Sequence, residues 1–254
     1  MFSDEFNKLV EAAKVKVKLL ENNFVGYFIA SMLAGFFVGI GVILSFTAAG
    51  SVSGEPYQKI VLGATFGIAL SLVIIAGSEL FTGNNLIMSA ANFKKEISFS
   101  KTLKLWTVCY IGNWVGAILI AALYVYSGLA KDPVLDFFDT VSVAKTTIPV
   151  AELIIRAILC NVLVCLAVWC SFRVKSESAK LIMIWWCLLA FIVIGLEHSI
   201  ANMTTLTVGI FSPNSAIELS GYFYNILIVS IGNIIGGVAF VAYPYYIISK
   251  KKGE

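Results

Sequence analysis

The sequence predicts an all-α membrane protein with six transmembrane helices, arranged as two inverted three-helix repeats in which helices two and five are broken. Composition is the first reason: apolar residues fill 59% of the 254 positions and charged residues only 13%, against roughly 25% charged in soluble domains. Six apolar runs approach or exceed the ~20 residues that a membrane-crossing helix needs. Two polar motifs also recur at nearly the same offset along the chain.

The six apolar runs lie at residues 25–47, 60–91, 105–126, 150–172, 181–211 and 222–248. An even number of spans places both termini on one side of the membrane. Fourteen of the 18 Lys and Arg residues lie in four segments: before the first run, between runs two and three, between runs four and five, and after the last run. The positive-inside rule assigns that side to the cytoplasm. We therefore expect a multi-pass protein of the cytoplasmic membrane with both termini cytoplasmic.

This pattern also divides the chain into segments. It predicts a cytoplasmic N-terminal amphipathic segment over 1–22, a first repeat over 23–128, an extracytoplasmic loop over 129–148, a second repeat over 149–248 and a cytoplasmic tail over 249–254. In the N-terminal segment, apolar residues such as Phe2, Phe6 and Leu9 fall near one helical face. Such a helix either lies along the membrane interface or forms a solvated tail.

Runs two and five are too long to be single straight spans. As unbroken helices they would be roughly 48 Å long at 1.5 Å per residue, against a hydrocarbon core of about 30 Å. Each is interrupted by polar residues, at 78–85 and 197–202, and the Glu79/Asn84 pair aligns with Glu197/Asn202 at an offset of 118. The motif Ile-Gly-Asn-x-x-Gly at 111–116 recurs at 231–236.

A repeat of three spans inverts the second half of the chain in the membrane, as in many transport proteins. The broken helices then meet near the midplane, where half-helix N-termini favour anions. The repeat therefore predicts a pathway for small anions at the two interruptions.

Other chemistry is poorly supported by the residues present. The single histidine and five cysteines, all in apolar runs without CxxC spacing, predict no metal site and no cofactor. No basic footprint for nucleic acid is present. A membrane enzyme using Glu197-His198-Ser199 is the rival from another class, but consecutive helical positions project about 100° apart and do not converge. We expect no enzyme activity and no catalytic residue.

Three segments together are typical of one known family: GSELFTGNN at 77–85, GLEHSIANM at 195–203, and Leu159-Cys160-Asn161. The chain resembles the formate/nitrite transporter family over essentially its whole length. The resemblance implies a homopentamer of aquaporin-like protomers in the lipid bilayer, each passing formate, nitrite or hydrosulfide. An aquaglyceroporin-like channel for neutral solutes is the alternative function, although the Asn-Pro-Ala signature of aquaporins is absent.

The resemblance also implies roles for individual residues. Thr82 and His198 are expected to face each other at the pore centre, with Lys145 attracting the anion. Asn161 is grouped with these pore residues and is expected to hold the histidine and the broken backbone. Two further sets are implied, an apolar constriction and its supporting polar residues: Phe66, Leu70, Leu80, Phe81 and Phe191 for the first, and Glu79, Asn84, Glu197 and Asn202 for the second. Gly83-Asn84-Asn85 departs from the small hydroxyl residues of many formate channels, which leaves the preferred anion open.

Each of these residues also has a structural interpretation. His198 could be a packed histidine bonded to a neighbouring carbonyl, and the carboxylates of Glu79 and Glu197 could cap backbone amides exposed by the interruptions. Apolar constriction residues such as Phe66 and Leu70 could equally be ordinary core.

Overall fold

The computed structural model describes residues 1–213 and 215–250 of the chain. The predicted tail at 249–254 therefore lies outside the described residues from position 251 onward, including two of the lysines used to assign orientation. The described part is helical, and its helices are connected by short loops. In chain order they are α1 (Ser3–Asn22), α2 (Phe24–Gly50), α3 (Gln58–Phe66), α4 (Ile68–Leu72), the π-helix η1 (Val73–Gly77), α5 (Phe81–Phe93), α6 (Phe99–Tyr126), α7 (Val134–Thr146), α8 (Val150–Arg173), α9 (Glu177–Ile194), α10 (Ser199–Phe211), α11 (Leu219–Gly237), the π-helix η2 (Val238–Ala242) and α12 (Tyr243–Ser249).

Six helical segments of the described residues are long and apolar enough to cross a membrane. They are Phe24–Gly50, Gln58–Gly77, Phe99–Tyr126, Val150–Arg173, Glu177–Ile194 and Leu219–Ser249. The second is formed by α3, α4 and η1 in series, and the sixth by α11, η2 and α12. The prediction of an all-α membrane fold with six spans is confirmed.

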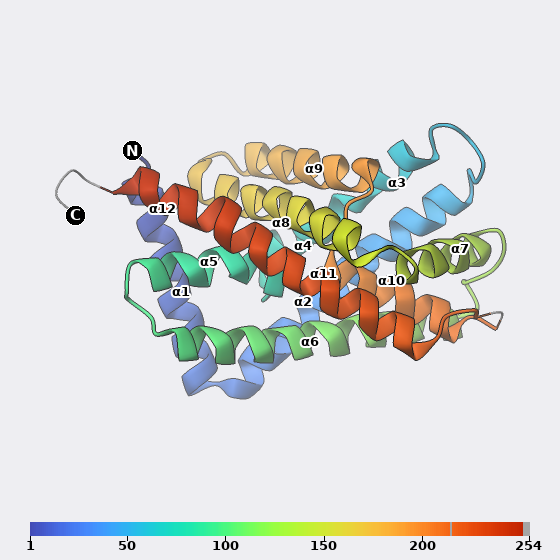
Figure 1. The fold of residues 1–254 in the computed structure, drawn as a ribbon, viewed down its shortest axis with the longest axis horizontal. Coiled ribbons are helices and arrows are strands. Elements are labelled where there is room, and N and C mark those ends of the chain that lie inside the picture. Colours follow the sequence, from blue (N-terminus) through green and yellow to red (C-terminus); the bar gives the residue numbers. More distant parts are fainter. Residues whose placement is uncertain (214, 251–254) are drawn as a thin grey trace.

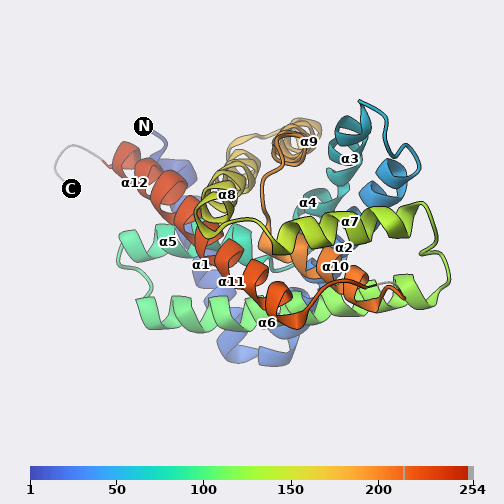
Figure 2. The ribbon, with the colours of Figure 1, turned by 45° about the vertical axis from the view of Figure 1, so that its right-hand side comes forward.

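The helices α5 and α10 each contain 13 residues, too few to cross a bilayer. Each follows a non-helical stretch, at 78–80 before α5 and at 195–198 before α10. These interruptions are shorter than the predicted polar segments at 78–85 and 197–202, because the helix resumes within each motif. In Figure 2, α5 lies toward the end that holds the chain termini, and α10 toward the end that holds α7.

Glycines allow the long helices to cross closely. A Cβ atom at Gly116 of α6 would overlap the Met32 carbonyl of α2, and one at Gly236 of α11 would overlap the Ile158 carbonyl of α8. The two glycines are equivalent positions of the repeated motif. Side chains longer than hydrogen at these positions would force the helices apart.

Two helices lie at opposite ends of the molecule, and both bear on the site. The N-terminal helix α1 crosses the ends of the other helices near both termini, whereas α7 lies at the far end (Figure 1). The apolar face of α1 is buried, with Phe6 and Leu9 both fully covered, so it is packed against the helix bundle and is not a free solvated tail. The stretch 129–148, predicted as a loop, contains the 13 residues of α7.

Candidate functional site

The two interruptions begin in the same way. Gly77 ends η1 with φ of 82°, and Gly195 follows α9 with φ of 86°. This left-handed region is accessible to glycine without strain. The chain then runs extended for three residues before α5 begins at Phe81 and α10 at Ser199. The two glycines are 118 positions apart, the same offset as the Glu/Asn motifs.

An asparagine from a neighbouring long helix supports each interruption. The Asn113 side chain of α6 accepts a hydrogen bond from the Phe81 N–H at 2.9 Å and donates to the Glu79 carbonyl at 2.8 Å. In the second half, Asn233 of α11 accepts from the Ser199 N–H at 2.9 Å and donates to the Glu197 carbonyl at 3.0 Å. Backbone groups freed by each interruption are thereby satisfied inside the protein, as a membrane environment requires.

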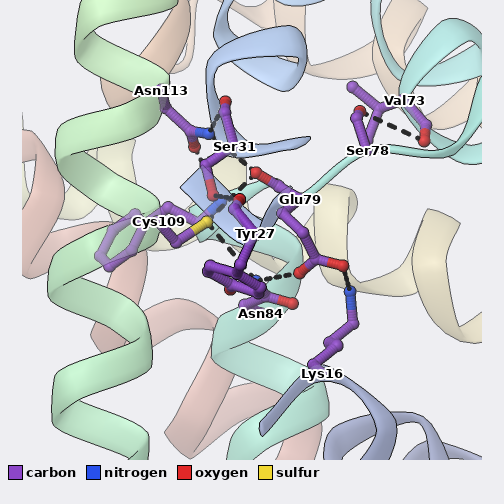
Figure 3. Close-up of polar contacts among 10 residues, drawn as sticks. Lys16, Tyr27, Ser31, Val73, Ser78, Glu79, Asn84, Cys109 and Asn113 are labelled. Carbon is purple, nitrogen blue, oxygen red and sulfur yellow. Dashed lines mark hydrogen bonds and ion pairs between the residues drawn. The ribbon is translucent and has the colours of Figure 1, made fainter. Parts of the chain in front are cut away.

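The Glu79 carboxylate joins the first interruption to α1. One oxygen of Glu79 accepts from the Lys16 ammonium at 2.6 Å, and the other accepts from the Asn84 side chain at 3.0 Å. Figure 3 shows these contacts together with the Cys109 thiol, which donates a hydrogen bond to the Glu79 carbonyl. The buried carboxylate of Glu79 is thus both ion-paired and hydrogen-bonded, because a buried charge without partners would be very costly.

The Glu197 carboxylate has the same environment at the opposite end. The Lys145 ammonium of α7 donates to both Glu197 oxygens, at 2.8 and 2.9 Å, and the Asn202 side chain donates to one of them at 2.6 Å. Neither glutamate accepts from a backbone amide in the described residues. The alternative that these carboxylates cap the interrupted backbone is therefore wrong, since Asn113 and Asn233 occupy that role.

Thr82 and His198 meet between the two interruptions. His198 Nε2 lies 3.0 Å from Thr82 Oγ1, while His198 Nδ1 accepts the backbone N–H of Ala201 at 3.1 Å. A nitrogen that accepts a hydrogen bond carries no proton, so the neutral ring has its hydrogen on Nε2 and donates it to Thr82. His198 is therefore both the N-cap of α10 and a donor toward the space beside Thr82.

Three cavities follow one another along this site. The α7-side vestibule, of about 330 Å³, is lined by Lys145 and Glu197 among others, and the α1-side vestibule, of about 660 Å³, by Lys16 and Glu79. Between them a central cavity of about 10 Å³ is lined largely by apolar side chains and by His198. A space of that size is comparable to a single water molecule.

Shared residues mark the boundaries between these cavities. Phe66, Phe191 and His198 line both the α7-side vestibule and the central cavity. Leu70 and Leu80 line both the central cavity and the α1-side vestibule. The Phe66 and Phe191 rings meet edge to face with centroids 5.5 Å apart. Two narrow apolar junctions therefore separate two vestibules, each of which contains a lysine–glutamate ion pair.

Three of the predicted pore residues, Thr82, Phe81 and Asn161, are not among the residues that line the three cavities. The Phe81 ring packs against Trp106 and Tyr110 of α6, with centroids 6.3 and 4.9 Å away, and is absent from the linings of the three cavities within the described residues. Its place in the sequence beside Leu80 suggested a shared role, but successive residues at a helix start point in different directions.

Asn161 is likewise buried away from the three cavities, with its side chain donating to the Asn233 carbonyl at 2.6 Å, to Asn85 at 3.0 Å and to the Thr82 carbonyl at 3.3 Å. These bonds to backbone carbonyls agree with the expectation that Asn161 holds the broken backbone. In the part of the chain that the structure describes, no cluster of three or more His, Cys, Asp or Glu side chains could hold a metal ion.

Sequence reasoning missed three residues of the site. Asn113 and Asn233 were present in the repeated Ile-Gly-Asn motif, and a polar amide inside an apolar span was the available signal. Lys16 was used only to assign orientation. Nothing local marks it, because its partner Glu79 is 63 positions away.

A family model described as formate/nitrite transporter matches residues 3–247. The chain belongs to the formate/nitrite transporter family. It is 42% identical over 253 residues to the nitrite transporter NirC of Escherichia coli (strain K12), covering 99% of this chain and 94% of that protein. Among solved structures, it is similar to an FNT family ion channel, with a TM-score of 0.93, 40% identity and coverage of 98% and 100% of the two chains.

A second solved structure of the family is a pentameric formate channel with formate bound. The likeness has a TM-score of 0.78 and 26% identity, and it covers 89% of this chain and 97% of that one. Family membership together with the six apolar spans makes the chain a multi-pass membrane protein of a transporter and channel family.

Proposed function

We propose that the chain is a channel for small monovalent anions, with nitrite and formate as its first candidate substrates and hydrosulfide as a third. The observation that carries this proposal is the Thr82–His198 contact beside a central cavity that is closed by apolar side chains on both sides. The relatives named for nitrite and the neighbour holding formate support the same class of substrate.

The proposed path runs from one vestibule to the other through the central cavity. Lys145 and Lys16 place ammonium groups in the two vestibules, each paired with a glutamate, and an anion that enters there first loses part of its hydration. Crossing the apolar junctions as a bare anion is costly, because no hydrogen-bond donor replaces the lost water. His198 lines the central cavity, and its Nε2–H is directed at the Thr82 hydroxyl 3.0 Å away. These two groups are the donors that we assign to the anion. Alternatively, His198 first takes up a second proton from solvent and then passes one proton to the anion, which neutralises it and returns the ring to its neutral form.

We further propose that the α1 side faces the cytoplasm and the α7 side the exterior of the cytoplasmic membrane. The excess of Lys and Arg on the side of the termini supports this orientation. The matched contacts of the two interruptions support an inverted repeat. The pentameric neighbour supports a homopentamer with one pore per protomer, and native mass spectrometry in mild detergent should find five copies.

Side-by-side flux measurements in proteoliposomes test this function. Nitrite, formate and hydrosulfide uptake should each exceed the rate in protein-free liposomes, whereas glycerol-driven swelling should not. Glycerol permeation without anion uptake would replace the proposal with the neutral-solute channel.

A further inference from the structure

Basic residues at the α7 end of the molecule are few, and most of them surround one cavity. Lys59, Lys131, Lys145 and Arg156 are the four of the 18 Lys and Arg residues that fall outside the N-terminal segment, the other two basic loops and the tail. Lys59, Lys145 and Arg156 all line the α7-side vestibule. Positive charge at this end is therefore concentrated at the mouth of the proposed path.

Two of these three cations already have a carboxylate partner. Lys145 donates to both oxygens of Glu197, and its side chain is only 15% exposed. Arg156 pairs with Glu152 at 2.8 Å. A paired ammonium or guanidinium presents much less net charge to an anion in solution than a lone one.

Lys59 differs from both. It lies in the first turn of α3, is exposed, and lines the vestibule. Among residues 1–213 and 215–250, no side chain or carbonyl forms an ion pair or hydrogen bond with its ammonium. Its full positive charge is consequently available at the mouth.

We propose that Lys59 is the anion-capture residue of the α7-side vestibule, where it concentrates small monovalent anions before they reach Lys145 and the Phe66–Phe191 junction. This inference rests on the proposed anion-channel function. A charged cleft with low-dielectric walls raises the local concentration of a counter-ion. One unit charge about 7 Å away in water is worth about 0.6 kcal/mol, which corresponds to about a two- to threefold change in local anion concentration.

The test compares nitrite permeability of proteoliposomes at about 20 mM and about 500 mM background salt, because attraction by an exposed charge is screened at high salt. Lys59→Gln should lower permeability about two- to threefold at low salt, and Lys59→Glu should lower it further. Lys59→Arg should retain the wild-type value. Lys131→Gln is the matched control, since this exposed lysine at the same end does not line the vestibule.

The outcomes separate the two claims. The inference is supported if the loss in Lys59→Gln largely disappears at high salt and is absent in Lys131→Gln. It is overturned if Lys59→Gln and Lys131→Gln have equal permeabilities at low salt while the wild type conducts nitrite. A wild type no faster than protein-free liposomes would instead contradict the channel function itself.

Discussion

Asn113 and Asn233, 120 positions apart, make the same three hydrogen bonds. Each side-chain oxygen accepts the first N–H of a half-helix, and each amide nitrogen donates to the glutamate carbonyl before it. The third bond goes to the Ser31 carbonyl of α2 at 2.7 Å for Asn113, and to the Ala157 carbonyl of α8 at 2.8 Å for Asn233. One side chain therefore joins an interruption to two long helices.

We expect Asn113→Ala and Asn233→Ala each to lower the thermal unfolding temperature in detergent. Each substitution leaves buried backbone groups without partners, at a cost of about 1 to 3 kcal/mol for each such group. Asn92→Ala is the control, because Asn92 donates a single bond to the Ile97 carbonyl near the helix end and is only partly buried. A smaller effect at Asn113 than at Asn92 would show that the interruption does not depend on this contact.

Substitution of Leu70 should show whether this side chain forms a constriction of the path or is ordinary core. Leu70→Ala removes a side chain shared by the central cavity and the α1-side vestibule, so we expect faster leak of small anions through proteoliposomes. Leu105→Ala is the matched variant: Leu70 is 3% and Leu105 0% exposed, and Leu105 lines none of the three cavities. Both should lose about 2 to 5 kcal/mol of stability. Equal leak of anions in the two variants would show that Leu70 is an ordinary core residue and not part of a constriction.

Asp139 should make the attachment of α7 depend on pH. It accepts a hydrogen bond from Ser212 at 2.7 Å, and its other carboxylate oxygen is buried without a partner among the described residues. Burial is the main cause that raises the pKa of Asp139 above its ordinary value of 3.8, and the charges of Asp136 and Asp132 add to it. The folded state therefore holds the proton more tightly than the unfolded state.

The sign of the effect follows from this difference. As pH rises above 3.8 toward the raised pKa, the folded protein retains protons that the unfolded chain has lost, so stability falls and then levels off. Asp139→Asn should flatten this dependence in hydrogen exchange of the α7 amides. Glu55→Gln, an exposed change at the same end, should retain the wild-type slope, and an unchanged slope in Asp139→Asn would refute the assignment.

Much of the architecture could be predicted from the sequence, because the length of an apolar run and the charge of a connecting loop are both properties of a single segment of the chain. The six spans and the positions of both interruptions follow from apolar runs and repeated polar motifs. Helix α7 was missed because it lies between spans, where composition predicts only an extramembrane connection.

The site could be predicted at residues that belong to a recognisable motif. It could not be predicted at residues whose position depends on contacts between distant helices. Thr82 and His198 do lie together as the resemblance implied. Three features depend on how distant helices pack. They are the ion pair of Lys16 with Glu79, the packing of the Phe81 ring against α6, and the unpaired charge of Lys59 beside the vestibule. No pattern along one segment of chain specifies those contacts.

The central claim is that anions pass His198 at a small cavity, lined largely by apolar side chains, between two apolar junctions. Its neutral ring caps α10 through Nδ1 and donates through Nε2, and a second proton would occupy the nitrogen that accepts the Ala201 N–H. Gain of a proton therefore changes both contacts, which predicts that transport depends on pH. Asparagine at this position keeps an N-cap acceptor but cannot titrate.

The most direct test is formate uptake by proteoliposomes between about pH 5 and about pH 8, a range around the ordinary pKa of histidine, for the wild type and His198→Asn. Thr82→Val accompanies them because it removes the facing hydroxyl while keeping shape. The wild-type profile should depart from the titration of formic acid itself, whereas His198→Asn should follow that titration alone, and Thr82→Val should slow uptake. A His198→Asn profile that superimposes on the wild type after this correction would contradict the proposed role of His198.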